Sequence, residues 1–387
     1  MFKKNKLLTI IILILFISSI LFITYNEIYP LEGEVGSFTP QINQGFVGEF
    51  LTNDGLKNMN ELATPNCKRP ETIIVHDGWV YGSFHGKIAR MREDGSDFKL
   101  IADTNGETLG FDFDSDGNLI FTDVKYNGKE AGVYKLNPNE KNPKITPVCR
   151  EIGGVSLKCP DALTISKNGI IYITDACQFR PLDYENADLA STTEFWYHTK
   201  SGKILAYDPI TKKGWKVASG FSFANGISLS EDEKYLYLSE TMGYSIWKIK
   251  TDAVNAVKYD NFNGSLDDSI ELLIDNLPGY PDNLMKGEDG RYWVGLVNIR
   301  SNDSDSIFNY GSSLRADYLR HYKITVDVND VKPGFAGVFA FDENGTISEF
   351  LMYPNTEYTK TTGAFETKNR LYIHSNSVTG TINYIDL

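Results

Sequence analysis

Short polar side chains recur at four separated places in the chain, each directly before an apolar segment. Each follows a Pro or Ala within two residues: Glu71 in RPETII, Asp161 in CPDALTI, Asn225 in FANGISL, and the pair Asp282–Asn283 in YPDNLMK. Taken singly, each is more simply a turn residue that starts a strand. Carboxylate and amide oxygens are, however, the ligands that a hard cation such as Ca²⁺ prefers. Their recurrence at equivalent places therefore favours one shared calcium site.

The four places are equivalent because they belong to an internal repeat. Each unit has a short apolar strand, a turn rich in Asp, Gly and Glu, and a strand of alternating aromatic and aliphatic residues. The fullest copy spans 224–250, and the others lie within 71–91, 109–136, 160–209, 281–351 and 363–387. Repeated strand–turn–strand units without helical spacing predict blades around a central axis. Six units predict an all-β, six-bladed β-propeller.

The propeller fold would bring the four polar places together, because the first residues of the inner strands surround the mouth of the central channel. Propellers commonly close by pairing strands from both ends of the chain. The segment GFVGEFL at 45–51 is the predicted strand that completes the last blade. We therefore assign 45–387 to the propeller and 26–44 to an irregular stalk.

The first residues predict a membrane anchor. Three lysines in MFKKNK precede a run without charge from Leu7 to Tyr25. That run has the length that a membrane-spanning helix needs, and it lacks the small-residue end of a cleaved signal peptide. The lysines place residues 1–6 in the cytoplasm. The sequence predicts a single-pass type II membrane protein with a transmembrane helix at 7–25 and a lumenal or extracellular propeller, in the endoplasmic reticulum or plasma membrane.

Two further features suit an oxidising compartment. Acceptor motifs for N-glycosylation occur at Asn263, Asn302 and Asn344. Four cysteines are present, and Cys149 and Cys159 flank a polar loop that a local disulfide could close. The sequence alone does not choose among the three pairings, and buried thiols are an equal alternative for Cys67 and Cys177.

Charge and motifs narrow the chemistry. The formal net charge of −13 argues against a nucleic-acid partner. The sequence has no G-x-S-x-G nucleophile elbow, H-E-x-x-H zinc helix or P-loop. A hydrolytic propeller would therefore depend on the metal, which polarises an ester or lactone carbonyl and stabilises the oxyanion. Asp282 is the candidate catalytic base or nucleophile beside it.

Two segments resemble a known family. FSFANGISLSEDEKYLYLSE (221–240) is similar to the corresponding blade of paraoxonases and strictosidine synthase-like proteins. NLPGYPDNLMKGEDGRYWVGL (276–296) resembles the adipocyte plasma membrane-associated protein family. The resemblance spans about 45–387 and is strongest from 160 to 300. It implies a six-bladed propeller, an N-terminal anchor, and calcium at the channel mouth held by Glu71, Asp161, Asn225, Asp282 and Asn283. Asp161 stands where the relatives more often have Asn.

The chain departs from these relatives at their catalytic residues. Strictosidine synthases use a Glu just before the inner strand of the last blade, where this chain has Thr362 or Gly363. The departure argues against alkaloid condensation. Paraoxonases use a His in a P-H-G turn, where this chain has Leu109 between Thr108 and Gly110. His85 and His374 could face the channel, although a surface or packed position is the simpler reading for both.

Two insertions, 178–200 and 299–336, lengthen blades three and five. The segment SIFNYGSSLRADYLRHY predicts a short helix, either over the channel mouth or on the surface. A cover of this kind would favour apolar or amphipathic substrates.

We expect a membrane-anchored, calcium-dependent esterase or lactonase, arylesterase-like, that acts on apolar esters. The alternative is a non-enzymatic, calcium-stabilised propeller that serves as an interaction platform.

Overall fold

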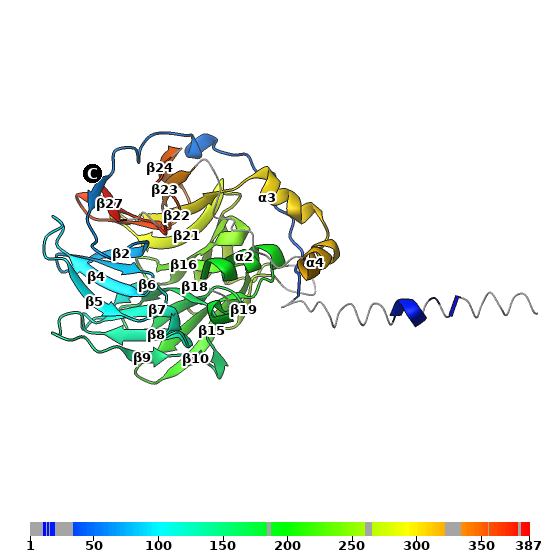
Figure 1. Cartoon of the computed structure of the whole chain (residues 1–387), viewed down its shortest axis with the longest axis horizontal. Helices are drawn as coiled ribbons and strands as arrows, with labels where there is room; N and C mark the ends of the chain where they lie inside the picture. The colour runs from blue at the N-terminus through cyan, green and yellow to red at the C-terminus, as the bar shows by residue number, and fades with distance from the viewer. Residues whose placement is uncertain are drawn as a thin grey trace, which may run out of the picture.

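Six sheets around a central axis make up most of the structure, which confirms the predicted six-bladed β-propeller (Figure 1). The structure is a computed structural model, and it describes residues 11, 12, 14, 16–19, 34–183, 187–259, 265–321, 334–354, 356–377 and 381–387. Blades follow one another in chain order, and within each of the first five blades the inner strand comes first; in blade six the outermost strand comes from the N-terminal part of the chain. The polar residues before the inner strands therefore all lie at the same end of the channel.

The first three blades contain the strands between residues 70 and 221, apart from one short hairpin, together with one short later strand. Blade one has β2 (Pro70–His76), β3 (Trp79–Phe84), β4 (Lys87–Met91) and β5 (Lys99–Asp103). Blade two has β6 (Thr108–Phe113), β7 (Leu119–Tyr126), β8 (Glu130–Leu136) and β9 (Thr146–Cys149). Blade three has β12 (Pro160–Ile165), β13 (Ile171–Asp175), β14 (Gly202–Asp208), β15 (Lys213–Phe221) and β19 (Ala256–Val257). A hairpin of β10 (Glu151–Ile152) and β11 (Val155–Ser156) lies between blades two and three in the chain.

The remaining strands form blades four to six. Blade four has β16 (Ala224–Leu229), β17 (Tyr235–Glu240), β18 (Ser245–Lys250) and β20 (Ile270–Ile274). Blade five has β21 (Gly279–Lys286), β22 (Tyr292–Ile299), β23 (Phe335–Phe341) and β24 (Ile347–Pro354). Blade six has β25 (Gly363–Glu366), β26 (Arg370–His374), β27 (Ile382–Asp386) and β1 (Asn60–Leu62).

Apolar side chains between adjacent blades form the core. Along β17 every residue from Leu236 to Glu240 is buried, because both faces of the blade contact neighbouring sheets. Tyr237 of blade four packs in one cluster with Tyr292 and Phe339 of blade five. The aromatic and aliphatic alternation in the repeat thus supplies side chains to two inter-blade layers.

The strand that closes blade six is β1, and the predicted closing strand at 45–51 is wrong. Asn60 pairs with Tyr384 and Leu62 with Ile382 of β27. Residues 45–51 are not extended, because Gly45 and Gly48 have φ of +68° and +60° and Gly48–Phe50 form the 3-10 helix η1. Phe46 and Phe50 of this segment pack on Phe350 of blade five instead. Aromatic spacing that resembles a strand therefore serves to bind the segment to the outside of blade five.

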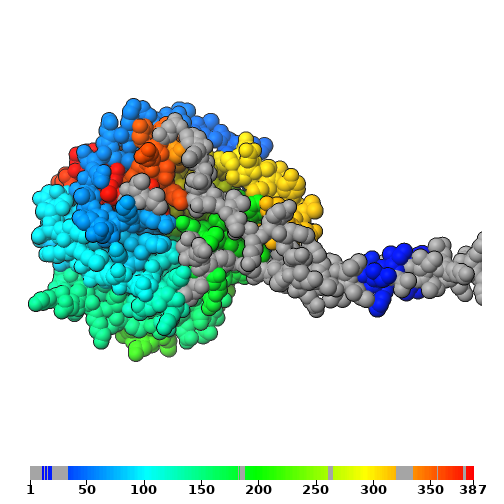
Figure 2. Space-filling view, viewed as in Figure 1, coloured from blue at the N-terminus to red at the C-terminus, as the bar shows by residue number. Residues whose placement is uncertain are grey.

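Both insertions contain helices. The first holds η2 (Pro181–Asp183) and α2 (Ala187–Tyr197), and the second holds α3 (Asn302–Ser306), η4 (Ile307–Asn309) and α4 (Ser312–His321). The insertions meet, because Arg315 Nη1 donates to Trp196 O at 3.2 Å and Trp196 stacks on Tyr318. Figure 2 shows the yellow and orange surface of α3 and α4 beside green atoms on one side of the propeller. A short helix, η3 (Thr241–Gly243), follows β17.

Most of the predicted anchor, residues 7–25, lies outside the described residues. Residues 11, 12, 14 and 16–19 are helical, and Phe16 is 62% exposed. Within the residues that the structure describes, no helix is long and apolar enough to cross a membrane. The anchor and the cytoplasmic tail at 1–6 stay predictions. Residues 34–44 of the predicted stalk form neither helix nor strand.

The closing strand can be tested with a matched pair of truncations. Leu62 is 5% exposed, whereas Val47 is 49% exposed. We expect Leu62→Ala to lower the free energy of unfolding by about 2–4 kcal/mol, since it leaves a cavity in the closed blade. Val47→Ala should change it by no more than about 0.5 kcal/mol. Urea unfolding measures both, and the reverse order of effects would assign closure to residues 45–51.

Candidate functional site

Irregular pairing at the start of the inner strands positions the candidate residues. The register between the first two strands shifts in blades one to five, at Pro70/Thr72, Thr108/Phe111, Pro160/Leu163, Ala224/Ile227 and Pro281/Leu284. A bulge redirects a side chain that would otherwise follow the pleat. The candidate residues all sit within these shifts: Glu71, Asp161, Asn225, Asp282 and Asn283. In blade two the residue within the register shift is the apolar Leu109. In blade six the pairing of β25 with β26 shows no register shift.

The structure brings all five predicted residues together at one end of the channel. Asn283 Nδ2 donates to Glu71 O at 2.9 Å and contacts Glu71 Oε1 at 3.4 Å. Asn225 Nδ2 donates to Thr241 Oγ1 at 3.2 Å, and the Asn225 side chain is close enough to Asp282 to oppose the rise in its pKa. Asp161 interacts electrostatically with both Glu71 and Asp282. Inner strands from four blades thus contribute oxygen atoms to one small region, as the recurring pattern predicted.

The three carboxyl groups in this region are buried and repel one another. Burial is the main cause that raises the pKa of Glu71, Asp161 and Asp282 well above ordinary values. The next cause for each is a neighbouring carboxylate of the same set. Glu71 Oε2 and Asn225 Oδ1 are buried without a hydrogen-bond partner. Buried acceptors without donors are costly, so this set of atoms fits a bound cation.

The carboxylates do not enclose an ion by themselves. Among the described residues, no group of three or more His, Cys, Asp or Glu side chains has the spacing of a metal site. An ion at this end of the channel would therefore also need amide oxygens, and Asn225 and Asn283 supply these groups. The role of the five residues as metal ligands stays a prediction.

Hydroxyl groups from the preceding blade hold the backbone of the shifted segments. In four cases a Ser or Thr hydroxyl donates to the carbonyl of a residue within a shift: Ser83 to Leu109 at 2.7 Å, Thr122 to Asp161 at 2.5 Å, Ser239 to Asp282, and Thr362 to Glu71 at 2.8 Å. Each bond crosses between two blades. The carbonyls are fixed by these bonds, so the side chains point into the channel from a rigid frame.

Three further charged residues belong to this end of the channel, and the sequence analysis missed them. Glu107 is buried, and its charge raises the pKa of Glu71 and Asp161. Asp188 of α2 forms an ion pair with Arg69 at 2.9 Å, and its charge raises the pKa of Glu71. Glu107 directly precedes Thr108, so its place in the repeat could have revealed it. Arg69 and Asp188 carried no such signal, since only the fold brings the first insertion over blade one.

The histidines occupy different surroundings. His374 is fully buried, and burial lowers its pKa to about 3, so it is neutral at physiological pH. His85 is part-exposed, with Nδ1 3.5 Å from Glu107 Oε1. His85 therefore lies at the channel mouth, whereas His374 is a packed side chain.

The position of the strictosidine synthase glutamate has no carboxylate here. A Cβ atom on Gly363 would lie 2.9 Å from His374 Nδ1 and 3.0 Å from Asn283 Cβ, so this position has little room for a side chain. Thr362 uses its hydroxyl to bind the backbone of Glu71. Glu366 is buried and accepts a bond from Trp293 Nε1 at 3.0 Å. Its surroundings indicate a structural role for Glu366.

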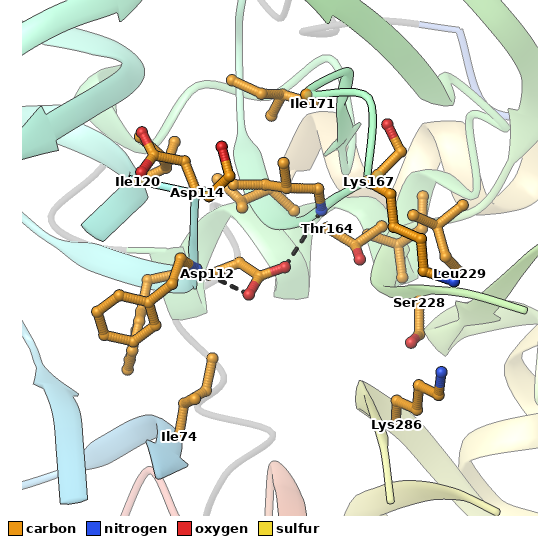
Figure 3. A pocket seen from close by; sticks show the side chains of 18 of the residues that line it. Ile74, Asp112, Asp114, Ile120, Thr164, Lys167, Ile171, Ser228, Leu229 and Lys286 are labelled. Atoms are coloured by element: carbon orange, nitrogen blue, oxygen red, sulfur yellow. Dashed lines mark hydrogen bonds between the residues drawn. The ribbon is translucent and has the colours of Figure 1, made fainter. Parts of the chain in front are cut away.

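The opposite end of the channel opens into a cavity of about 860 Å³ (Figure 3). The inner strand of each blade contributes at least one apolar side chain to its wall, including Ile74, Phe111, Leu163, Ile227, Leu284 and Phe365. Figure 3 shows the Asp112 carboxyl among these walls, with Lys286 and Ser228 farther across. The carboxylate accepts bonds from Phe113 N at 2.8 Å and Ile165 N at 3.2 Å. Burial nevertheless raises the pKa of Asp112 to about 6.

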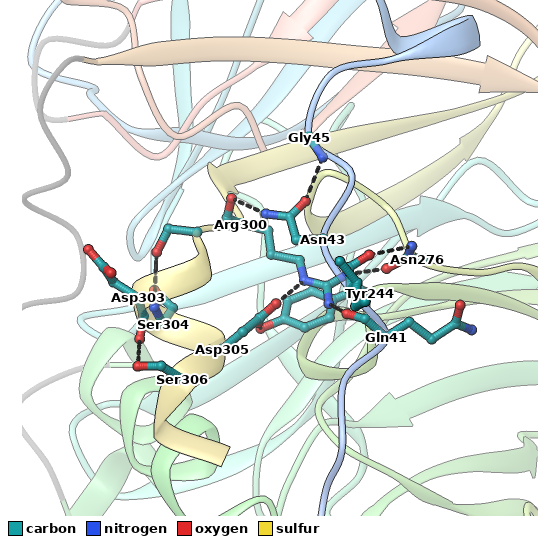
Figure 4. A network of polar contacts seen from close by, with 12 residues as sticks. Gln41, Asn43, Gly45, Tyr244, Asn276, Arg300, Asp303, Ser304, Asp305 and Ser306 are labelled. Carbon is teal, nitrogen blue, oxygen red and sulfur yellow. Dashed lines mark hydrogen bonds and ion pairs between the residues drawn. The ribbon is translucent and has the colours of Figure 1, made fainter. Parts of the chain in front are cut away.

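An arginine network anchors the second insertion (Figure 4). Arg300 Nε pairs with Asp305 Oδ2 at 2.8 Å, and the guanidinium lies 4.1 Å from the ring centroid of Tyr244. Arg300 also donates to Asn276 Oδ1 at 2.6 Å and to the carbonyl of Gln41. The network joins α3 to blade four and to the N-terminal segment, so the insertion is held at its base.

All four cysteines are free and buried in this structure, so it contains no Cys149–Cys159 disulfide, and that pairing stays a prediction. Cys149 packs in one apolar cluster and Cys159 in another, beside Cys177. The loop between Cys149 and Cys159 closes through its own backbone, as β10 pairs with β11 and Leu157 N donates to Arg150 O at 2.9 Å. Backbone hydrogen bonds, and not a disulfide, therefore hold the two ends of this loop together.

Two of the three asparagines in glycosylation motifs lie within the described residues. Asn302 is the first residue of α3 and is exposed. Asn344 is exposed in the turn between β23 and β24. Asn263 lies outside the described residues. Glycosylation at all three sites stays a prediction.

The carboxyl in the cavity gives a pH-dependent prediction. The pKa of Asp112 is about 6 in the folded chain against an ordinary value of 3.8, so protonation favours folding. The stability that protonated Asp112 contributes to the folded state is fully present below about pH 3.8 and is lost as the pH rises through about 6. Asp112→Asn should therefore stabilise the protein relative to the wild type at pH 7.5, and this gain should vanish near pH 4. Urea unfolding across this range measures it, with Asp116→Asn as the exposed control; a gain independent of pH would contradict the assignment.

Comparison with known proteins agrees with the geometry. Residues 161–252 match the strictosidine synthase family, and residues 48–91 match the N-terminal region of strictosidine synthase-like proteins. The chain is 30% identical to strictosidine synthase-like protein 6 of Arabidopsis thaliana over 69% of this chain and 64% of that protein, slightly under two thirds of its length. It is 24% identical to the adipocyte plasma membrane-associated protein of Rattus norvegicus over 85% of this chain and 86% of the relative.

Solved structures share the fold at low identity. A gluconolactonase from Xanthomonas campestris superposes with a TM-score of 0.53 at 16% identity, covering 83% of this chain and 86% of that one. A calcium-binding protein, regucalcin, from Agrobacterium tumefaciens gives 0.52 at 11% identity, covering 83% and 91%. At these identities the likeness shows the propeller alone. The sequence comparisons show that the chain is similar to strictosidine synthase-like proteins and to adipocyte plasma membrane-associated proteins.

Proposed function

We propose that the channel end formed by Glu71, Asp161, Asn225, Asp282 and Asn283 binds calcium, and that the protein is a calcium-dependent ester or lactone hydrolase. The observation that carries the proposal is the convergence of three buried carboxyl groups with two buried acceptor atoms that lack donors. A divalent cation would offset the repulsion among the carboxylates and occupy both acceptors. The fold shared with a gluconolactonase and a calcium-binding regucalcin supports this proposal.

Asp282 is the candidate catalytic residue. Bound calcium would polarise the substrate carbonyl and stabilise the oxyanion that forms. The Asn225 side chain lies beside the Asp282 carboxyl, and the Ser239 hydroxyl donates to the backbone carbonyl of Asp282. Because Leu109 occupies the shifted position in blade two, a carboxyl group must act as base or nucleophile in place of a histidine.

The surroundings of the site favour apolar esters such as aryl esters. Leu109 packs in one apolar cluster with Phe195 of α2, Phe223 and Phe308. The first insertion reaches the same end of the channel through the Asp188–Arg69 ion pair. An acyl or aryl group bound beside the carboxylates would therefore meet apolar walls. Charged esters would lose this contact.

The same observations leave a second function open, a calcium-stabilised interaction platform without catalysis. Leu109 stands at the paraoxonase histidine position, and Thr362 or Gly363 stands at the strictosidine synthase glutamate position. An ion coordinated from four blades would couple strands that are distant in sequence and stabilise the native state by mass action. Calcium binding without hydrolysis is the result expected for this function.

Membrane attachment through residues 7–25 completes the proposal, with the propeller lumenal or extracellular. The rat relative is named for an association with the plasma membrane. Protease added to intact microsomes should leave the propeller protected and remove only the short cytoplasmic tail. Digestion of the propeller before detergent is added would contradict the orientation. A propeller that is digested only after detergent is added would agree with the orientation.

Replacing Asp282 tests the calcium site and the chemistry together. We expect the full-length protein in detergent to bind one Ca²⁺ by isothermal titration calorimetry and to hydrolyse phenyl acetate or a lactone in a chelator-sensitive manner. Asp282→Asn removes a charged ligand and the candidate base, so calcium affinity should fall at least about tenfold, roughly 1.4 kcal/mol. Hydrolysis should fall to background.

Asp116→Asn is the matched control for this measurement, because Asp116 is exposed in the turn between β6 and β7. It should leave both calcium affinity and hydrolysis unchanged. Full activity in folded Asp282→Asn would refute the metal-centred chemistry. Calcium binding without hydrolysis of any ester or lactone tested would favour the platform, and absence of calcium binding would refute the site.

A further inference from the structure

Cys159 and Cys177 lie together beside the proposed calcium site. Ala176 N donates to Cys159 O at 2.8 Å, so Ala176 is directly opposite Cys159 and Cys177 is the next residue. Both cysteines are fully buried in one apolar cluster. The two thiols interact with each other, and this interaction together with burial raises the pKa of Cys159. We propose that Cys159 and Cys177 form a disulfide when the chain folds under oxidising conditions.

The other two cysteines are placed where neither can join this pair. Cys67 packs in a cluster with side chains of blades one and six, and Cys149 packs in a cluster between blades two and three. A disulfide requires its two Cα atoms to lie within about 7 Å of each other. Cys159 directly precedes β12, Cys177 lies two residues after β13, and the bond from Ala176 N to Cys159 O holds these two segments side by side, so Cys159–Cys177 is the pairing that the fold supports.

The reaction needs a disulfide-carrying oxidant, such as oxidised glutathione or the disulfide of a thiol oxidoreductase. One cysteine thiolate attacks the oxidant's disulfide and releases one thiol, which leaves a mixed disulfide on the chain. The second cysteine thiolate then displaces the other half of the oxidant. The net change is oxidation of two thiols to one disulfide and reduction of the oxidant to two thiols. Both cysteines are fully buried in the folded chain, so the exchange belongs to folding, before the blades close over them.

The disulfide would fix two functional segments at once. Cys159 lies two residues before Asp161, and its backbone N–H donates to Asp175 Oδ1 at 2.6 Å. Cys177 lies just after β13 and begins the insertion that carries α2 and Asp188. A covalent bond here would join the start of the Asp161 segment to the base of α2. It closes a short loop, and such bonds stabilise mainly by restricting the unfolded chain.

Peptide mapping of the full-length chain tests the pairing. The protein is unfolded in guanidinium with reductant, refolded in detergent with reduced and oxidised glutathione, and alkylated before digestion. Trypsin cuts after Lys158 and Lys167, which puts Cys159 and Cys177 in different peptides. We expect these two peptides to be joined until reduction, and Cys67 and Cys149 to be alkylated. Alkylation of both Cys159 and Cys177 in folded protein, or a linkage to Cys67 or Cys149, would overturn the proposal.

The melting temperature, measured with and without reductant, distinguishes a Cys159–Cys177 disulfide from two thiols that only lie close together. Reductant should lower the Tm of the oxidised wild type by about 5 °C. Cys177→Ser should show no response to reductant, whereas the control Cys67→Ser should respond as the wild type does. If Cys177→Ser fails to fold, the mapping of the unmodified chain still decides the pairing. These results are independent of calcium and hydrolysis, so either proposal can fail without the other.

Discussion

Three buried carboxyl groups that share one end of a narrow channel are the constraint on which the rest of this structure depends. Glu71, Asp161 and Asp282 lie close enough to raise one another's pKa, and water is largely excluded from them. Such an arrangement needs either protons or a cation to be stable. A cation is the better match, because Glu71 Oε2 and Asn225 Oδ1 remain without donors.

The fold maintains this arrangement by distributing it across blades. A register shift at the start of each of five inner strands turns the side chains into the channel. Hydroxyls of neighbouring blades then bind the backbone carbonyls of Glu71, Asp161 and Asp282. Because the five residues come from the inner strands of four blades, the site depends on the packing of those blades around the axis. The blade that β1 closes meets the site through Thr362, which directly precedes β25 and donates to Glu71 O.

The sequence revealed those parts of the structure that repeat. Six copies of one strand pattern gave six blades, and equivalent places in four copies gave five residues that the fold brings together. Residues 45–51 were misassigned because aromatic spacing alone does not distinguish a strand from a segment that packs Phe46 and Phe50 on a blade's exterior. The Cys149–Cys159 pairing rested on nearness in sequence, whereas the fold packs the two side chains in different apolar clusters. Arg69 and Asp188 meet only through tertiary structure, so a repeat pattern carries no sign of them.

The most direct test of the account is a crystal structure of the protein grown with calcium chloride, with an anomalous difference map. The account predicts one strong peak at the channel end, with oxygen atoms of Glu71, Asp161, Asn225, Asp282 and Asn283 at about 2.3–2.6 Å. An empty channel end at saturating calcium, with the carboxyl groups hydrogen-bonded to one another as protonated acids, would contradict it.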